Sequence, residues 1–514
     1  MMIKILCFTT FVILIPTLCM SISSPVAIQQ IDTLMNNYYE NGLFDGVLLV
    51  AEKKHIIYHK AFGLADREWN IPMTTNTKFK IASISKPFTA IIILQLVQEG
   101  KIKLDGTLAE YIPDYTGAKK DSITIHQLLT HTSGLIGNLK PEDEAVQERL
   151  PHELRSMVHY AEDASLLCEP GSEFHYSNFG YNILAFIAEQ VTGKPFAVLL
   201  QERVFTPGNM IDSKQYVNTQ IEPRLARGYE YKLLTGYENT TFFDNSFVTG
   251  CGGVISTAED MFNWHCALFS DRLVTNELKQ LMYKPIKQVQ YGYGWGINYK
   301  TINNIQDTLI ITEHSGSING FGSYFGQVLD DTTCIIVLKN SRENTFINPV
   351  FAPDIAREII SLLYNEKVPP HKKSIARHLA LIIGKEGFDT AKKEYYRIKQ
   401  QESTRYLLDE SELNKLGIEL LFKFKLPDEA LHVFALNLAE FPKSYNTYDS
   451  YAYALMQKQE YAASIRYYRE GLEILKKYPR ENAGPQIEKD AQNALEFIKE
   501  MESKLSTEKR GDKL

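Results

Sequence analysis

The chain of 514 residues is poor in cysteine, and two of its six cysteines lie within the first twenty residues. The other four are far apart and include no Cys-x-x-Cys pair: Cys168, Cys251, Cys266 and Cys334. This spacing excludes a disulfide-rich scaffold and a zinc knuckle, although one disulfide of unknown pairing remains open. None of the 12 histidines belongs to a His-Glu-x-x-His motif. The sequence therefore predicts no metal site and no cofactor.

An excess of positive charge is also absent. The 55 Lys and Arg residues are outnumbered by 62 Asp and Glu residues, which gives a net charge of -7. This balance argues against a nucleic-acid partner bound through bulk positive charge. With 30 Gly, 20 Pro, 44% hydrophobic and 23% charged residues, the composition excludes collagen-like, mainly disordered and multi-spanning membrane proteins. At roughly 150 residues per domain, the length suggests about three domains, or one large two-lobed domain with a smaller companion.

One long apolar run stands at the start of the chain. Lys4 precedes apolar residues 5–20, which Pro16 interrupts, and the small residues 21–24 follow. A basic start, an apolar stretch and small residues are typical of a secretory signal, and the stretch is short for a membrane span. We therefore predict a signal peptide at residues 1–23 and an exported protein, periplasmic or secreted. Contact with a membrane is expected only if this leader stays uncleaved.

Strand-like and helix-like patterns divide the next part of the chain. The expected strands are residues 46–52, 55–63, 308–312, 322–328 and 333–339; the expected helices are 27–39, 84–100 and 353–364. Helical and loop signals dominate between residues 104 and 283. We predict an α+β domain at residues 24–366, with an antiparallel sheet flanked by the terminal helices. The helical insertion forms a second lobe, and a cleft lies between the lobes.

The C-terminal part has a different composition. After a linker at residues 367–373 with two prolines, helix formers dominate and no strand-like run occurs. Residues 427–434 match residues 461–468 at a period of 34, and this resembles tetratricopeptide repeats. We predict a tetratricopeptide-like helical domain at residues 374–502 that offers a surface to a protein partner, followed by a disordered tail at 503–514. A plain helical bundle is the alternative.

Ser83 and Lys86 open the apolar helix expected from residue 84. The Ser-x-x-Lys spacing alone is weak, because it also occurs at Ser506 and Lys509. In this context the two side chains lie one turn apart on the same face of a helix start. The helix dipole and burial disfavour a charged ammonium there, so Lys86 is suited to accept a proton from the serine. The alternative is an N-capping serine beside a solvated lysine.

Two further motifs carry polar side chains that suit a cleft. Tyr176 and Asn178 lie two positions apart in a polar stretch, and a phenol near a lysine is a credible proton carrier. Residues 314–317, His-Ser-Gly-Ser, end the strand expected from residue 308. We expect Gly316 to let a substrate approach this strand and the amide of Ser317 to donate a hydrogen bond. The alternatives are a packing tyrosine and a strand-end turn with a surface histidine.

Together the three motifs resemble, in order and spacing, the active-site motifs of serine beta-lactamases and penicillin-binding-protein hydrolases. They are Ser83-x-x-Lys86, Tyr176-x-Asn178 and His314-Ser315-Gly316. The Tyr-x-Asn form is similar to the class C branch, with its D,D-peptidase, D-aminopeptidase and esterase relatives. Flanking residues 124–135 and 250–257 agree with the pattern, so the resemblance spans about residues 27 to 365.

The resemblance implies a role for each matched position. Ser83 would be the acylated nucleophile, Lys86 its deprotonating partner and Tyr176 the carrier of protons to the leaving group and from the water. Substrate binding would fall to Asn178, His314, Ser315 and Gly316, and the oxyanion hole to the amides of Ser83 and Ser317. The implied function is an exported serine hydrolase that forms an acyl-enzyme with an ester, a D-amino-acid peptide or amide, or a beta-lactam.

His314 departs from the family pattern, in which many members carry a lysine. A lysine is a permanent cation suited to a substrate carboxylate, whereas a histidine is mostly neutral at pH 7. We therefore expect weaker carboxylate recognition, and esterase or peptidase chemistry in preference to efficient beta-lactam hydrolysis.

A non-enzymatic alternative is an inactive platform whose helical repeats bind a protein partner. The intact serine, lysine and tyrosine set counts against this alternative, because loss of function usually erases one of them. The flank contains His126 and His131, to which we assign structural hydrogen bonds rather than chemistry.

Overall fold

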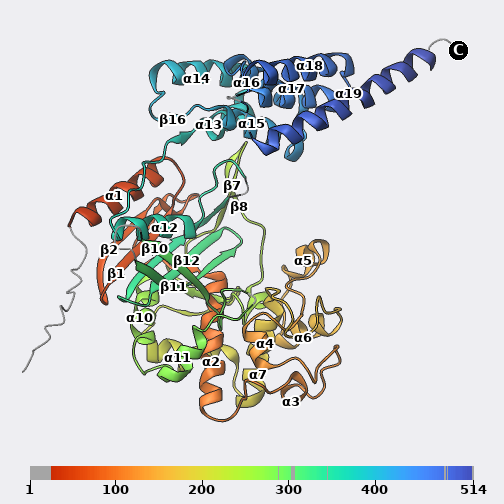
Figure 1. The fold of residues 1–514 in the computed structure, drawn as a ribbon. Helices are drawn as coiled ribbons and strands as arrows, with labels where there is room; N and C mark the ends of the chain where they lie inside the picture. The colour runs from red at the N-terminus through yellow and green to blue at the C-terminus, as the bar shows by residue number, and fades with distance from the viewer. Residues whose placement is uncertain are drawn as a thin grey trace, which may run out of the picture.

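The computed structural model describes residues 25–511, apart from 288, 303–306, 344, 480, 481 and 483. The predicted signal peptide, residues 1–23, lies outside the described residues. Figure 1 shows a sheet domain with a helical lobe below it and a separate helical domain above it. The predicted α+β class with an appended helical domain is confirmed.

Six strands form the central sheet, and every pairing in it is antiparallel. Their order is β10 (Gly296–Ile302), β11 (Asp307–Ile318), β12 (Phe321–Val328), β13 (Thr333–Lys339), β1 (Gly46–Glu52) and β2 (His55–Phe62). β1 pairs with β13, so strands from the two ends of the predicted α+β domain meet within the sheet. Both are nearly continuous apolar runs, which require cover on both faces of the sheet.

Helices cover both faces. α1 (Pro25–Glu40) and α12 (Ala352–Leu363) pack on one face, where α12 presents an apolar stripe at helical spacing. α2 (Ser85–Gln98) and α10 (Ala258–Leu268) belong to the core on the other face. α2 is apolar on nearly all sides because it is buried between the sheet and the helical lobe.

The helical lobe is built from the insertion between the strands. Its helices are α3 (Leu108–Tyr111), α4 (Ile125–Leu129), α5 (Pro141–Gln147), α6 (Leu154–Glu162), α7 (Asn178–Thr192), α8 (Phe196–Leu200), α9 (Thr206–Gly208) and α11 (Asn276–Met282), with a π-helix at Gln201–Phe205. Short strands outside the central sheet are β3 (Leu64–Asp66), β4 (Ile71–Pro72), β5 (Phe79–Lys80), β6 (Lys214–Gln215), β7 (Tyr229–Lys232), β8 (Gly236–Asn239), β9 (Val254–Ser256) and β14 (Ser341–Glu343).

The C-terminal domain is a stack of helices. They are α13 (Ile375–Glu386), α14 (Phe388–Gln401), α15 (Glu410–Ile418), α16 (Pro427–Glu440), α17 (Tyr445–Gln457), α18 (Tyr461–Lys477) and α19 (Pro485–Gly511), with a π-helix at Glu419–Lys423. Two short strands, β15 (Lys373–Ser374) and β16 (Tyr406–Leu407), pair near the linker. The two matched sequence segments begin α16 and α18, while the tetratricopeptide assignment itself stays a prediction.

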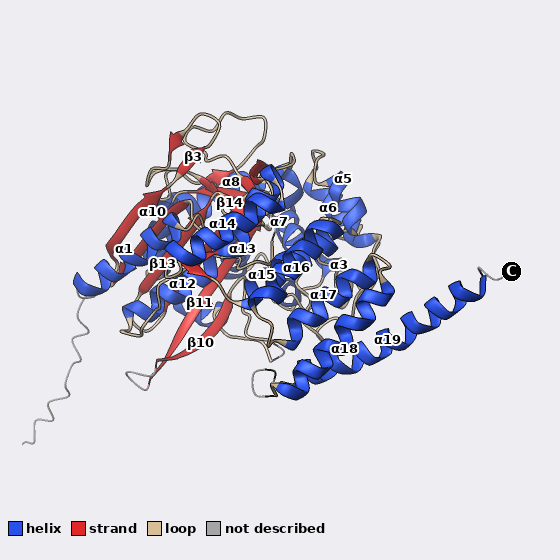
Figure 2. Cartoon of the chain, turned by 90° about the horizontal axis from the view of Figure 1, so that it is seen from above, coloured by secondary structure: helices blue, strands red, loops and turns tan. Residues whose placement is uncertain are grey.

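Helix α19 differs from the sequence-based expectation. It continues past Ser503, where the sequence predicts a disordered tail, and reaches Gly511. Figure 2 shows its C-terminal end leading away from the other helices. No single described helix is long and apolar enough to cross a membrane; by length and composition, one bent pair, Asn178–Thr192 with Phe196–Gly208, passes that test jointly.

Candidate active site

Ser83 lies in a one-turn 3₁₀ helix, Ala82–Ile84, that leads directly into α2. The preceding Ala82 has a φ of 48°, a left-handed conformation that a residue with a side chain rarely adopts. Lys86 lies in the first turn of α2, is fully buried and donates a hydrogen bond from Nζ to Ser83 Oγ at 3.0 Å. The capping alternative is therefore wrong, because neither helix start has a side-chain cap and the lysine is not solvated.

Two other acceptors fix the ammonium group of Lys86. Its Nζ donates to Asn178 Oδ1 at 2.8 Å and to the carbonyl of Cys251 at 3.0 Å. Asn178 is the first residue of α7, and the Cys251 carbonyl comes from the flank identified in the sequence. With two hydrogens directed to these oxygens, the remaining position on Nζ faces the Ser83 hydroxyl. A neutral amine held in this way presents its lone pair to the serine proton.

Strand β11 holds the third motif and extends to Ile318, past the predicted strand end. A side chain at Gly316 would clash with the carbonyl of Ile81 and with the hydroxyl of Ser323. The missing side chain thus makes room for the backbone before Ser83, while the approach of a substrate to this glycine stays a prediction. Ser323 of β12 donates to the same Ile81 carbonyl at 2.8 Å, which ties the nucleophile turn to the sheet.

A chain of hydrogen bonds joins the second motif to the third. The amide of Ser177 donates to His131 Nδ1 at 3.0 Å, and His131 Nε2 contacts the Tyr291 hydroxyl at 3.2 Å. The same hydroxyl contacts His314 Nε2 at 3.2 Å, and His314 Nδ1 contacts the Ser315 carbonyl at 2.7 Å. An amide only donates and a carbonyl only accepts, so we assign the proton to Nε2 of His131 and to Nδ1 of His314. Tyr291 then accepts from the first histidine and donates to the second.

Burial keeps both histidines neutral. Burial, and next the charge of Lys86, lowers the pKa of His314 to about 3. The same two causes, joined by His314, hold the pKa of His131 well below its usual range. His314 is thus neither a surface residue nor a cation at pH 7. Tyr291 was missed in the sequence, because it stands in an irregular segment with no motif around it.

Tyr176 lies at the edge of the site. The centroid of the Tyr176 ring lies 4.3 Å from the centroid of the His131 ring. Lys86 Nζ lies 4.7 Å from the centroid of the Tyr176 ring. Tyr176 is 38% exposed, so the residue is accessible from solvent. A tyrosine that served only for packing would be buried, which favours the proton-carrier interpretation.

A cavity of about 300 Å³ opens at the nucleophile. Its lining includes three of the predicted site residues: Ser83, Asn178 and Ser317. It also includes three charged residues that the sequence analysis missed: Glu144, Glu148 and Arg342. Burial and Glu148 raise the pKa of Glu144; burial raises the pKa of Glu148, against the opposing charges of Arg149 and Arg342. No pattern in the sequence distinguishes these three from surface charges.

Two more of the predicted site residues belong to a second cavity. Ser315 and Gly316 line a second cavity of about 470 Å³, which also contacts Ser317 and Arg342. Among the described residues, no group of three or more His, Cys, Asp or Glu side chains could hold a metal ion. The four described cysteines are free thiols.

A buried lysine bonded to a serine one helical turn earlier, across from a tyrosine and an asparagine, defines a serine hydrolase of the Ser-x-x-Lys type. Residues 29–355 match the Beta-lactamase family, which is more than half of the chain. The chain belongs to this family. The match ends before α13, so the C-terminal helical domain lies outside it.

Two relatives and two solved structures illustrate the similarity. Penicillin-binding protein 4* of Bacillus subtilis is 28% identical over 341 residues, covering 62% of this chain and 72% of the relative. Protein flp of Staphylococcus aureus is 25% identical over 351 residues, covering 66% and 67%. A penicillin binding protein from Bacillus halodurans superposes with a TM-score of 0.55 at 25% identity, covering 64% and 99%. D-amino acid amidase from Ochrobactrum anthropi SV3 superposes with a TM-score of 0.56 at 24% identity, covering 66% and 97%.

Proposed function

We propose that the protein is an exported serine hydrolase that works through an acyl-enzyme. Ser83 is the nucleophile, Lys86 is its base and Tyr176 carries protons to the leaving group. The observation that carries this proposal is the 3.0 Å contact between Lys86 Nζ and Ser83 Oγ, with two further acceptors fixing the amine. Export rests on the basic and apolar leader at residues 1–23.

The reaction follows from the positions of these groups. Lys86 takes the proton of Ser83 Oγ while this oxygen attacks the substrate carbonyl. The amides of Ser83 and Ser317 stabilise the negative oxygen that forms, and such donors each contribute about 10²–10³ in rate. Tyr176 passes a proton to the departing alcohol or amine. Water then attacks the acyl-enzyme and gives one proton to Tyr176, while Lys86 returns its proton to Ser83 Oγ as the bond between this oxygen and the acyl group breaks.

The charges around the cavity favour esters and D-amino-acid amides or peptides over beta-lactams. His314 is neutral and already bonded at both ring nitrogens, so it offers no fixed positive charge to a beta-lactam carboxylate. Glu144 and Glu148 suit the ammonium group of an amino-acid substrate, while Arg342 is the one permanent cation among the described lining residues. The similarity to D-amino acid amidase supports the same substrate class.

A substrate panel tests this function. The purified chain without its leader is assayed against p-nitrophenyl acetate, D-alanine p-nitroanilide and nitrocefin. We expect kcat/KM for the ester or the anilide to exceed that for nitrocefin at least about tenfold, and Ser83→Ala to abolish all three activities. Ser403→Ala, an exposed serine of the helical domain, is the matched control.

Three results would change the proposal. Nitrocefin as the best substrate would overturn the substrate class, and residual turnover by Ser83→Ala would overturn the nucleophile. If the wild-type chain turned over none of the substrates and bound no fluorophosphonate, the non-enzymatic platform would become the better account. In that account the helical domain binds a protein partner. We propose the same partner-binding role for this domain in the active enzyme.

A further inference from the structure

The three-residue strand β14 faces the active site and the C-terminal helical domain at the same time. In the chain it follows the central strand β13 directly. It pairs in parallel with β7. Neighbouring side chains of a strand point to opposite faces. Arg342 accordingly lines the active-site cavity, whereas Glu343 is directed to the helical domain.

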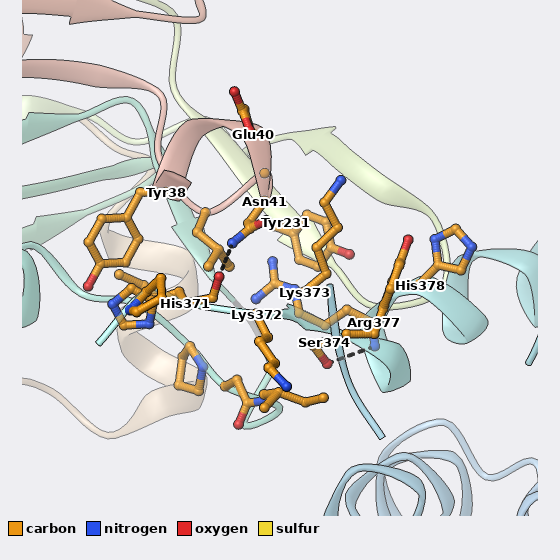
Figure 3. A pocket seen from close by; sticks show the side chains of 18 of the residues that line it. Tyr38, Glu40, Asn41, Tyr231, His371, Lys372, Lys373, Ser374, Arg377 and His378 are labelled. Carbon is orange, nitrogen blue, oxygen red and sulfur yellow. Dashed lines mark hydrogen bonds between the residues drawn. The ribbon is translucent and has the colours of Figure 1, made fainter. Parts of the chain in front are cut away.

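Glu343 forms a buried ion pair with the first turn of the helical domain. Arg377 Nη1 of α13 lies 2.5 Å from Glu343 Oε2, and the two side chains are 9% and 5% exposed. The guanidinium also lies 4.2 Å from the ring centroid of Tyr231 on β7. Figure 3 shows Arg377 beside Tyr231 and Ser374, at a cavity of about 940 Å³ between the two domains. Removal of Arg377 would leave Glu343 with only the longer contact to Lys339 Nζ, at 4.0 Å, and removal of Glu343 would leave the guanidinium buried without a carboxylate.

The chain beyond β14 is held by the helical domain as well. Thr345 Oγ1 and the amide of Phe346 donate to Glu419 Oε1 at 2.5 and 2.7 Å, and Glu419 is fully buried. Asn348 donates to Glu412 of α15, which is also buried. Helical-domain side chains therefore hold both Glu343 and the segment that follows it. Arg342 sits between these anchors and the end of the central sheet.

We propose that the C-terminal helical domain positions Arg342, and that Arg342 raises the turnover of substrates with an anionic acyl group, against the opposing charges of Glu144 and Glu148 in the same cavity. Arg342 is the specificity-determining residue, because its fork of donors matches a carboxylate. Arg377 is a positioning residue, which acts through Glu343 of the same strand. The inference rests on the proposed hydrolase function and assigns the appended domain a role in the active site.

Two esters with the same leaving group test the inference. The full chain is assayed with neutral p-nitrophenyl acetate and with mono-p-nitrophenyl glutarate, whose acyl group carries a carboxylate. We divide kcat/KM for the glutarate ester by kcat/KM for the acetate ester. We expect Arg342→Gln to lower this ratio about tenfold, because the variant loses one charge-assisted hydrogen bond to the carboxylate. Arg377→Met should lower the ratio severalfold through KM of the glutarate ester, with kcat unchanged.

Three controls separate positioning from a loss of folding. Arg377→Lys should restore part of the ratio, and Arg342→Gln combined with Arg377→Met should match Arg342→Gln alone. Arg397→Met, an exposed arginine of α14 paired with Glu394 and Glu402, is the matched control in the same domain. If Arg377→Met fails to fold, Thr345→Val tests the other anchor, because Glu419 keeps its hydrogen bond from the amide of Phe346.

The outcomes are distinct. An unchanged ratio in Arg342→Gln would overturn its role in specificity. A lowered ratio in Arg342→Gln with unchanged ratios in Arg377→Met and Thr345→Val would overturn the positioning by the helical domain. Absence of turnover of both esters by the wild-type chain would instead contradict the proposed function.

Discussion

The catalytic centre and the contacts between the helices of the C-terminal domain rest on different interactions. In the catalytic domain, buried polar groups from distant segments bond to one another, as Lys86 does with Ser83, Asn178 and Cys251. In the helical domain, small residues let helices approach closely; a side chain at Gly417 would clash with the Phe434 ring. Catalysis needs atoms at hydrogen-bond distance, whereas a helical stack needs only close packing. The two domains should therefore respond differently to matched substitutions.

The largest effect on activity is expected from substitution of Lys86, the lysine at the centre of the polar network. Lys86→Met keeps the length of the side chain but removes the base and leaves the Cys251 carbonyl and the Asn178 amide oxygen without this donor. We expect kcat/KM for p-nitrophenyl acetate to fall by a factor of about 10³ or more. Lys103→Met, an exposed lysine of the same domain, is the control. Activity within tenfold of wild type would show that another group deprotonates Ser83.

The second effect concerns the contact between the nucleophile turn and the sheet. Gly316→Ala forces a methyl group against the Ile81 carbonyl, so we expect a loss of about 1–3 kcal/mol in the free energy of unfolding and reduced ester turnover. Gly322→Ala on the neighbouring strand is the matched control, because its methyl group would meet its nearest neighbour at 3.8 Å. Urea unfolding and ester assays measure both variants. Equal stability of the two variants would contradict the close approach.

The third effect is a loss of stability at acidic pH. We expect it in the catalytic domain, where the buried histidines among the described residues lie. Burial lowers the pKa of His265 to about 4, partly offset by its bonds to Gln327 and Thr332. Between pH 6.5 and 4 the unfolded chain binds one proton more at this residue than the native chain does. The free energy of unfolding therefore decreases as the pH is lowered through this range, by up to about 1.4 kcal/mol per pH unit for this histidine.

His265→Gln should remove that contribution. Urea unfolding at pH 7, 6, 5 and 4.5 gives the slope for the wild-type chain and the variant, with the exposed His55→Gln as the matched substitution. A His265→Gln slope equal to the wild-type slope would show that this residue is not a neutral buried group.

The smallest effect is expected in the helical domain. Ser464 is fully buried and donates to the Ala452 carbonyl at 2.7 Å, in the position where the repeat pattern favours alanine. Because packing rather than this bond holds the helices together, Ser464→Ala should change the free energy of unfolding by less than about 1 kcal/mol. It should leave ester turnover unchanged. A loss above 2 kcal/mol would show that the helical domain also depends on buried polar bonds.

The same contrast explains how much the sequence could predict. Long apolar runs and helical periodicity located α1, α2, β1, β2, β12, β13 and α12 to within a few residues. The edge strand β10 was missed, because its buried positions alternate irregularly with exposed ones. The end of β11 was placed too early, because the motif at residues 314–317 contains serine and glycine, which are typical of turns.

Within the site, the motif residues were predictable and their partners were not. Ser83, Lys86 and Asn178 stand in motifs of fixed spacing, and the structure brings them into contact. Tyr291 and Arg342 reach the site only through the tertiary fold, since a relay between two histidines and a three-residue strand leave no local pattern. The contact of Gly316 with the backbone of Ile81 was not predictable, because the sequence does not show which segment packs on a strand.

The identity of the residue that a serine-directed probe labels is the most direct test of the account. The wild-type chain is labelled with a fluorophosphonate probe, digested and mapped by tandem mass spectrometry, with Lys86→Met labelled in parallel. We predict one adduct, on Ser83, and a rate of labelling that falls at least about a hundredfold in Lys86→Met. An adduct on another residue, or equal rates of labelling in the two chains, would contradict the assignment of the Ser83–Lys86 pair.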